Sequence, residues 1–362
     1  MNNVINKNSQ LYFGDLFSSE KFISLCKIEM SCVVVLTDNH VGSLYEKKIL
    51  AHLKNNGIVV HLISIPAGEV SKTRETKLEI ENKMFSLRCG RDTMMIALGG
   101  GVVTDLAGFV AATYCRGIPI IYIPTSLLCM VDASIGGKTG VNTSFGKNTV
   151  GTFTKPKAIF TDISFLVSLP EEEYLSAASE IIKHALIYDL DYFLFLENNL
   201  DKFFSRDLVF LEQIIIRSCE IKEDIVADDE KEIGKREILN YGHTIAHALE
   251  MACDYKLSHG SAVAYGLIAE SFIANKIGFL PDSEFKRILF IISKILCKLN
   301  KKIAVSVDKV ISALKYDKKN RNRRIRFVIL QNIGLVFTEN NSFAHPIADS
   351  IIQESIQFII KN

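Results

Sequence analysis

The first half of the chain alternates short apolar runs with amphipathic stretches. Runs of this length that are rich in β-branched residues predict strands. The strands are expected at residues 31–37, 59–65, 93–98 and 119–124. Residues 44–55 and 71–87 lie between them and read as helices. Strands that alternate with helices form βαβ units, so this half predicts a Rossmann-like α/β domain with a mostly parallel sheet.

The second half reads differently, because the pattern becomes helical from Glu171 onward. The expected helices cover residues 171–189, 191–200, 207–227, 238–251, 260–277 and 282–299. Only residues 325–330 resemble a strand here. A single core stops growing at about 250–300 residues, and this chain has 362. We therefore expect an α/β domain over residues 1–169 and a mainly α-helical domain over residues 170–362.

Composition narrows the class of protein. The chain has 42 basic and 41 acidic residues, which argues against a nucleic-acid partner, because such proteins carry a basic excess. No apolar run approaches the length that spans a membrane. The eight cysteines are scattered, and the first residues do not resemble a signal peptide. These features predict a cytoplasmic protein with reduced thiols.

A glycine-rich turn follows the third predicted strand and opens a helix. Its residues are Gly99, Gly100, Gly101, Val102, Val103, Thr104 and Asp105. Glycines let a backbone approach a pyrophosphate closely, and the start of a helix offers free N–H groups to phosphates. The spacing differs from the usual dinucleotide fingerprint, so an ordinary tight turn without a ligand remains open. Glu69 and Lys72, at the opening of an earlier helix, could add contacts of the same kind.

Two further glycine-rich segments carry lysines and an aspartate. The first contains Asp132 and Lys138, and the second contains Lys147 and Asn148. Loops rich in glycine, hydroxyl groups and lysine suit an anionic or polyhydroxylated ligand. A solvated surface loop with incidental lysines is the alternative.

Three of the eight histidines fall within a short stretch of the second half. His243 and His247 are four residues apart at the start of a predicted helix, so they share one face. His259 follows at the head of the next helix, and Glu180 lies on an earlier one. One carboxylate with two or three imidazoles is a ligand set that a catalytic zinc uses. A pair of histidines at this spacing is common by chance, and the glutamate alone carries almost no signal.

The motifs together resemble a known family. The run from Gly99 to Gly151, Ser179–Lys183, Arg236–Thr244 and His259–Gly260 are similar in order and spacing to the 3-dehydroquinate synthases, within the sugar-phosphate cyclase superfamily. The resemblance covers the chain from about Thr37 to Gly334.

The resemblance implies a shikimate-pathway lyase that serves the biosynthesis of chorismate and the aromatic amino acids. Such an enzyme converts 3-deoxy-D-arabino-heptulosonate 7-phosphate to 3-dehydroquinate and phosphate, using NAD and a divalent zinc or cobalt ion. It implies an NAD-binding domain over residues 1–169, a metal- and substrate-binding domain over residues 170–362, and a homodimer.

The resemblance also implies roles for individual residues. The metal ligands are Glu180, His243 and His259. The catalytic and substrate-binding residues are His247, Lys138, Lys183, Arg236, Asn240, Glu232 and Asp132. The phosphate contacts are Arg116, which a second subunit could supply, Lys147, Asn148 and one of Lys318 or Lys319. The NAD contacts are Asp38, Glu69, Lys72, Gly99, Gly100, Gly101, Val102, Val103, Thr104, Asp105, Thr125, Ser126, Lys138, Lys147, Phe165, Leu166, Val167 and Ser168.

Three positions depart from the family pattern. Ser261 stands where the family usually has glutamate, Ser179 where it favours alanine, and His40 where an asparagine often holds the nucleotide. None replaces an expected ligand, but Ser261 removes a carboxylate beside the metal-binding helix and His40 bears on NAD affinity.

The nearest alternative is another sugar-phosphate cyclase, such as 2-deoxy-scyllo-inosose synthase. The intact run from Gly136 to Gly140 favours dehydroquinate synthase. A more distant alternative is a metal-dependent alcohol dehydrogenase of the glycerol dehydrogenase type, and the last is an inactive binding protein on the same fold.

Overall fold

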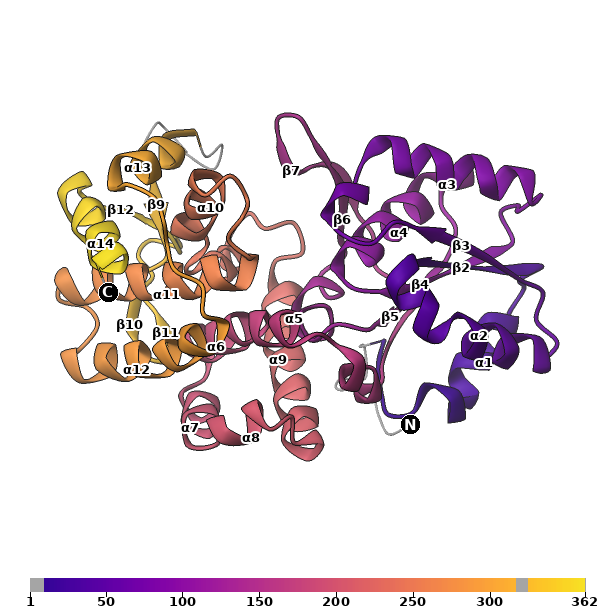
Figure 1. The fold of residues 1–362 in the computed structure, drawn as a ribbon, viewed down its shortest axis with the longest axis horizontal. Coiled ribbons are helices and arrows are strands. Elements are labelled where there is room, and N and C mark those ends of the chain that lie inside the picture. The colour runs from indigo at the N-terminus through magenta and orange to yellow at the C-terminus, as the bar shows by residue number, and fades with distance from the viewer. Residues whose placement is uncertain (1–9, 317–324, 362) are drawn as a thin grey trace. The chain divides into compact units, whose positions relative to one another are not determined.

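The computed structural model describes residues 10–316 and 325–361. The chain forms two compact units, Met1–Leu169 and Pro170–Asn362 (Figure 1). The first is an α/β unit and the second is mainly helical, and each is described below by itself. Among the described residues, no helix combines the length and the apolar character that crossing a membrane requires.

A parallel sheet of six strands forms the centre of the α/β unit. Its strands, in spatial order, are β1 (Leu11–Phe13), β8 (Ala158–Thr161), β5 (Ile120–Pro124), β4 (Thr93–Gly99), β2 (Cys32–Asp38) and β3 (Val60–Ile65). Every neighbouring pair is parallel. The central strands β4 and β5 are buried throughout, as expected for a sheet covered on both faces. The predicted mostly parallel sheet is confirmed.

Helices cover both faces of this sheet. They are α1 (Glu20–Lys27), α2 (Asn39–Asn55), α3 (Arg74–Ser86) and α4 (Gly101–Thr113). Helices α3 and α4 lie on one face, and α1 and α2 on the other (Figure 1). Asp38 and Thr73 cap α2 and α3 through their side chains. The sequence pattern missed β1, α1 and β8, which are short.

The glycine-rich segments expected to be loops form an antiparallel hairpin instead. Its strands are β6 (Lys138–Thr143) and β7 (Gly146–Phe153). Gly140 and Gly151 face each other across it, and a Cβ built on Gly151 would lie 1.8 Å from the carbonyl oxygen of Thr139. Here the glycines allow two backbones to approach closely. A glycine-rich sequence is also typical of loops, which is why the hairpin was predicted as loops.

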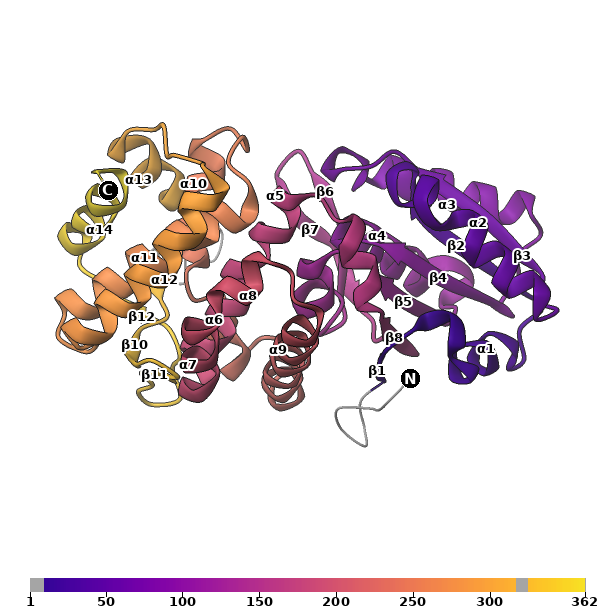
Figure 2. The same ribbon diagram turned by 60° about the horizontal axis from the view of Figure 1, so that its bottom comes forward.

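The second unit is built from helices. They are α5 (Glu171–Ser176), α6 (Ala178–Tyr188), α7 (Leu190–Asn198), α8 (Leu200–Phe204), α9 (Leu208–Asp228), α10 (His243–Ala252), α11 (His259–Lys276), α12 (Asp282–Leu299), α13 (Val307–Tyr316) and α14 (Asp349–Lys361). Helix α11 lies at the centre of the bundle, against α6, α10, α12 and α14 (Figure 2). It is buried on nearly all sides, as a central helix must be.

Two predicted boundaries in this unit were wrong, and two helices were missed. The helix expected over residues 171–189 divides into α5 and α6 at Ala177. The helix expected from residue 238 begins only at His243, because residues 235–240 form a 3-10 helix and Gly242, just before α10, has a left-handed φ of 80°. Helices α13 and α14 were not predicted.

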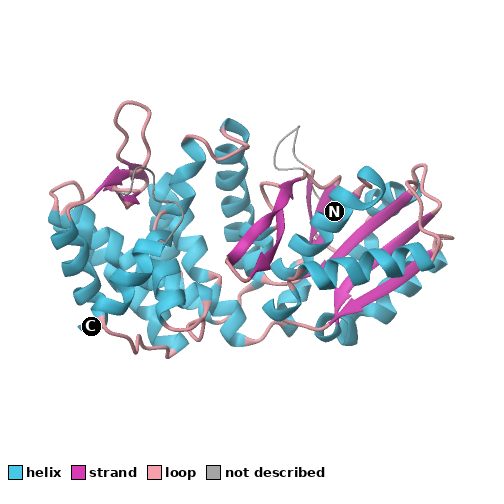
Figure 3. Ribbon diagram, turned by 90° about the horizontal axis from the view of Figure 1, so that it is seen from above, coloured by secondary structure: helices cyan, strands magenta, loops and turns pink. Residues whose placement is uncertain are grey.

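The strand predicted at residues 325–330 is two short strands. β9 (Arg326–Phe327) pairs with β12 (His345–Pro346), and β10 (Leu330–Asn332) pairs with β11 (Leu335–Val336). Residues 327–330 are all buried and apolar, so the sequence pattern gave no sign that the chain changes from one partner strand to another here. The strands of this unit are few and small (Figure 3).

Candidate functional site

Three helices of the second unit bring a carboxylate and two imidazoles together. Glu180 lies in α6, His243 begins α10 and His259 begins α11. Oε1 of Glu180 lies 3.1 Å from Nε2 of His243 and 3.4 Å from Nε2 of His259. One ligand atom from each residue lies within 4.8 Å of the other two. This is the set of ligands that the sequence predicted.

Two glycines allow α10 and α11 to pack closely enough for this arrangement. A Cβ on Gly266 would lie 1.9 Å from the carbonyl oxygen of Gly242. The backbone N–H of Gly242 donates to the buried carboxylate of Glu270, at 2.9 Å. Together these contacts fix where α10 starts, and so fix His243.

Two serines fix His259 relative to Glu180. The hydroxyl of Ser179 donates to the carbonyl oxygen of Gly260 at 2.7 Å, and the N–H of Gly260 donates to the hydroxyl of Ser176 at 3.1 Å. Gly260 has no room for a side chain, because a Cβ would lie 2.1 Å from the carbonyl oxygen of Ser176. The start of α11 is therefore held on the end of α5 and the start of α6, next to the two ligands.

The charges of the cluster follow from its surroundings. Burial would raise the pKa of Glu180, but Lys183 and the two histidines outweigh it and hold that pKa well below its usual range. Burial lowers the pKa of His243 despite Glu180. Burial also acts to lower the pKa of His259, but the neighbouring carboxylates of Glu180 and Glu250 raise it to about 10. Glu180 is therefore the anionic member of the cluster, and the two imidazoles differ in their affinity for a proton.

The residues present fit a divalent metal ion. Both carboxylate oxygens of Glu180 are buried, and within the described ranges neither satisfies the geometry of a hydrogen bond. Nδ1 of His243 lies 3.1 Å from the carbonyl oxygen of Tyr241. When Nδ1 carries the proton and donates to this oxygen, Nε2 has a free lone pair for a metal. Nδ1 of His259 faces Glu250 at 3.6 Å. A carboxylate and two imidazoles with such outer partners suit zinc or cobalt.

Lys183 and His247 lie beside this cluster. Lys183 is buried and forms an ion pair with Oε2 of Glu180. The ring of His247 lies 5.5 Å from that of His243 and 6.5 Å from that of His259, measured between centroids. His247 is not among the grouped ligand atoms of the described residues. Its expected role toward a substrate stays a prediction.

The segment before α10 gathers the other expected residues of this unit. Asn240 donates to Glu232 at 2.8 Å, and buried Arg236 donates to the carbonyl oxygen of Glu230 at 2.6 Å. Asp229 accepts hydrogen bonds from the backbone N–H groups of residues 233, 234 and 236. One carboxylate thus shapes the segment that carries Arg236 and Asn240.

In the α/β unit the glycine turn joins β4 to α4. Gly99 ends the strand and Gly101 begins the helix, as predicted. The N–H of Thr125 donates to the carbonyl oxygen of Gly99, and a Cβ on Gly100 would lie 3.2 Å from the hydroxyl of Ser126. The sheet order reverses between β2 and β4, and nucleotides bind at the carboxyl ends of strands at such a point.

Lys72 connects several predicted contacts near this turn. It is buried, and Nζ donates to Asp105 in α4 and to Asn148 in β7, each at 2.5 Å. Nearby, Asn142 donates to Glu69 at 2.7 Å. Lys138 and Lys147 are exposed on the hairpin, and Asp132 is half-buried in a helical turn after Ser126.

Several predicted residues lie in less direct positions. Asp38 already caps α2 with hydrogen bonds from His40 and Val41. Phe165 and Leu166 are buried in the unit's core, so only their backbones could meet a ligand. Val167 is exposed, and Ser168 bonds to Tyr45. The other members of the turn are Val102, Val103 and Thr104, of which the last two are buried.

Arg116 lies just beyond the far end of α4. The helix has 13 residues, which at about 1.5 Å each separates Arg116 from the glycine turn by roughly 20 Å. Lys318 and Lys319 lie outside the described residues.

Glu250 and Lys222 are among the buried charged residues that the sequence analysis did not identify. Glu250, which faces His259, is 4% exposed, and Lys222 in α9 is 6% exposed. Glu250 follows His243 and His247 on one face of α10, at spacings of four and then three. That periodicity was the available signal.

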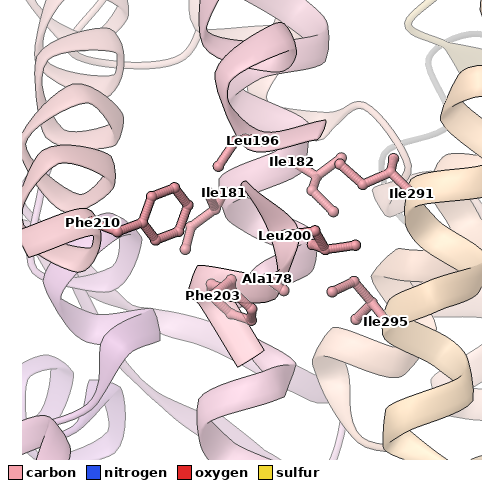
Figure 4. Close-up of a pocket in the computed structure, with 9 residues that line it drawn as sticks. All are labelled: Ala178, Ile181, Ile182, Leu196, Leu200, Phe203, Phe210, Ile291 and Ile295. Carbon is pink, nitrogen blue, oxygen red and sulfur yellow. The ribbon is translucent and has the colours of Figure 1, made fainter. Parts of the chain in front are cut away.

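The opposite face of α6 points into an apolar pocket (Figure 4). Its lining consists of Ala178, Ile181, Ile182, Leu196, Leu200, Phe203, Phe210, Ile291 and Ile295. These side chains offer no polar group to orient a sugar. Helix α6 therefore separates a hydrophobic face from the face that carries Glu180 and Lys183.

The fold and the site together define a class, namely enzymes with a nucleotide-type α/β unit and a helical unit that carries a candidate metal site. Comparisons with known proteins identify the family. Family models described as 3-dehydroquinate synthase N-terminal and C-terminal match residues 62–176 and 177–320.

Curated relatives agree with the family models. The chain is 42% identical to the 3-dehydroquinate synthase of Thermoanaerobacter sp. over 328 residues, which cover 90% of this chain and 92% of the relative. It is 41% identical to that of Desulforamulus reducens over 305 residues, covering 84% and 85%. The chain belongs to the 3-dehydroquinate synthase family, which confirms the predicted activity.

Solved structures of other cyclases share the fold at lower identity. A 2-deoxy-scyllo-inosose synthase with carbaglucose-6-phosphate, NAD+ and Co2+ has a TM-score of 0.87 at 25% identity, covering 96% of each chain. ValA, a 2-epi-5-epi-valiolone synthase from Streptomyces hygroscopicus with NAD+ and Zn2+ bound, has a TM-score of 0.86 at 25% identity, covering 100% of this chain and 99% of its own. A glycerol dehydrogenase from Schizosaccharomyces pombe, at 17% identity, shows a common fold alone.

Proposed function

We propose that the chain converts 3-deoxy-D-arabino-heptulosonate 7-phosphate to 3-dehydroquinate and inorganic phosphate, with NAD at the glycine turn of the α/β unit and a zinc or cobalt ion at Glu180, His243 and His259. The observation that carries the proposal is the convergence of these three ligand atoms within 4.8 Å. The two cyclase structures described above contain NAD+ together with Co2+ or Zn2+, which supports the same pair of cofactors here.

The bound cofactors would supply the redox and Lewis-acid chemistry: NAD accepts and returns a hydride, and the metal acidifies a substrate hydroxyl. Glu180, His243 and His259 hold the metal, each from a different helix. The glycine turn offers the N–H groups at the start of α4 to the pyrophosphate. Residues 1–169 thus form the NAD-binding domain, and residues 170–362 the metal- and substrate-binding domain.

The chain's own side chains bind and orient the substrate. Lys183, Arg236 and Asn240 hold its carboxylate and hydroxyls, together with Lys138 from the hairpin. Glu232 accepts a hydrogen bond from Asn240 and so orients that amide, and Asp132 orients polar groups in the same way. Lys183 is also the cation that keeps Glu180 ionised.

His247 moves a proton at the substrate. It lies beside both metal-binding imidazoles but outside their grouped ligand atoms. An imidazole in such a position can donate to or accept from a substrate hydroxyl near neutral pH.

The phosphate is held by Lys147 and Asn148, with one of Lys318 or Lys319, and with Arg116 of a second subunit. The distance along α4 between Arg116 and the glycine turn supports that origin and a homodimer. The eight cysteines are free thiols, which fits a cytoplasmic enzyme.

The test is phosphate release from the heptulosonate phosphate by the NAD-loaded protein, with and without a chelator. We expect release that the chelator abolishes and that zinc or cobalt restores. Glucose 6-phosphate serves as the counter-substrate, because its carba analogue is bound in the 2-deoxy-scyllo-inosose synthase structure. Phosphate release from glucose 6-phosphate alone would overturn the proposal.

A further inference from the structure

A second group of metal-binding side chains lies in the α/β unit. Cys32 begins β2, His61 is the second residue of β3, and Cys89 lies in the turn between α3 and β4. One ligand atom from each lies within 4.8 Å of the other two. Cys32 and His61 stand near the amino ends of parallel strands, whereas Gly99 stands at the carboxyl end of β4. The group therefore lies at the amino ends of the strands, opposite to the carboxyl ends where the glycine turn lies.

The register of the sheet places these side chains on one face. Cys32 pairs with Thr93 of β4, and Val34 pairs with His61 of β3. Alternate residues of a strand point to the same face, so Cys32 and Val34 share a face, and His61 shares it with them. Cys32 and His61 are thus placed by strand pairing.

The turn that carries Cys89 is held from two sides. The backbone N–H of Cys89 donates to the carbonyl oxygen of Met84 at 3.0 Å, and the carbonyl oxygen of Cys89 accepts from the hydroxyl of Tyr114 at 2.8 Å. Both thiols are buried, at 8% exposure for Cys32 and 5% for Cys89, while His61 is half-buried. The group is thus preorganised, with the imidazole on its accessible side.

The separation of the two sulfurs suits a shared metal. They lie 4.0 Å apart, and two thiolates at about 2.3 Å from a tetrahedral zinc ion lie about 3.8 Å apart. The hydroxyl of Thr93 lies 3.5 Å from the sulfur of Cys32, as an outer partner of a ligand does. Two thiolates with an imidazole form a soft set that selects zinc-like ions over magnesium or calcium.

We propose that Cys32, His61 and Cys89 form a second metal site, which takes a soft divalent cation of the zinc class and is separate from the site at Glu180. On binding, each thiol loses its proton to solvent and forms a sulfur–metal bond, Nε2 or Nδ1 of His61 forms the third bond, and water completes the tetrahedron. No electron is transferred.

The proton release has a clear basis. The metal displaces the protons of both thiols, because only the thiolate form of cysteine is a ligand. The bound ion would join β2, β3 and the turn before β4, and would stabilise the unit by binding only its folded state.

The test is a titration of the metal-stripped, reduced full-length protein with Co2+ alone. Cobalt bound by thiolate gives a strong sulfur-to-cobalt charge-transfer absorption, whereas cobalt at Glu180, His243 and His259 has no sulfur ligand. We expect this absorption in the wild-type protein, its loss in Cys32→Ser/Cys89→Ser with one equivalent less of bound cobalt, and its weakening in His61→Gln. Cys297→Ser, at an exposed thiol of the other unit, is the matched control and should behave as wild type.

The design separates this site from the proposed catalytic one. The three substituted residues have no part in the proposed chemistry, so phosphate release by the variants should match wild type, which also shows that they fold. The proposal is overturned if the wild-type protein shows no charge-transfer absorption, if the absorption survives in the double variant, or if the two thiols form only a disulfide and exclude the metal.

Discussion

Ser179 donates a buried hydrogen bond of 2.7 Å to the carbonyl oxygen of Gly260. The bond ties the residue before Glu180 to the residue after His259, and so fastens α6 to α11 beside two candidate metal ligands. The family resemblance led us to expect alanine at the position of Ser179. This chain therefore has a hydrogen bond between α6 and α11 at a position that the sequence analysis noted only as a departure from the family pattern.

Substitution of Ser179 by alanine should lower the free energy of unfolding by about 1–2 kcal/mol, because a buried carbonyl loses its partner. Metal affinity should change by less than about tenfold, since every ligand remains. Urea unfolding of the metal-stripped protein measures the first effect and chelator competition the second. Ser205→Ala, which removes an exposed hydroxyl from the same unit, is the control. Equal stability of the two variants would show that the bond contributes nothing.

The stability that Asp229 contributes should depend on pH. Burial acts to raise the pKa of Asp229, but hydrogen bonds from three backbone N–H groups outweigh it and lower that pKa. A carboxyl group with a depressed folded pKa stabilises the protein above its unfolded pKa and loses that contribution as pH falls through the folded value. Asp229→Asn should therefore be less stable than wild type at neutral pH, and the difference should shrink below about pH 4.

The same variant should bind substrate less well, because Asp229 shapes the segment that carries Arg236 and Asn240. We expect a raised KM with a smaller change in kcat. Denaturant unfolding across the pH range gives the stability difference, and initial rates give KM. A constant stability difference down to acid pH would contradict the role of the charge.

Replacement of His259 by alanine should remove a metal ligand with little effect on the fold. Metal affinity and turnover should each fall by at least about 100-fold, since loss of a direct ligand exceeds the cost of losing an outer partner. Metal analysis after dialysis, circular dichroism and phosphate release provide the measurements. His345→Ala changes a half-buried histidine of the same unit outside the cluster and should retain wild-type metal affinity and turnover. If His259→Ala kept its full metal content and rate, His259 would not be a metal ligand.

Lys138→Ala should raise KM and lower kcat, because the lysine is expected to contact substrate in both the ground and transition states. Loss of a charged hydrogen bond costs about 1.5–3 kcal/mol, which corresponds to roughly 10–100-fold in kcat/KM. The side chain is exposed at the start of β6, so thermal stability should change little. Steady-state kinetics with the heptulosonate phosphate measure both parameters. An unchanged KM would show that Lys138 is a solvated surface residue without a role in substrate binding.

The sequence by itself determined the elements whose signals are local. Short apolar runs gave β2 to β5, and the glycine turn between Gly99 and Gly101 was found because a strand must end and a helix must begin there. The spacing of His243 and His247 gave their shared face. The nearby His259 joined them in an expected metal site, and the family motifs then added Glu180, which no local pattern could connect.

Only the tertiary structure decided what depends on contacts between distant segments. Glycine composition could not distinguish a loop from the β6–β7 hairpin, because Gly140 and Gly151 are needed only once the two strands face each other. The pairing of β2 with β3 and β4 likewise brings Cys32, His61 and Cys89 together from three separate places in the chain. Such proximity follows from strand register and helix packing, and a sequence read one segment at a time contains neither.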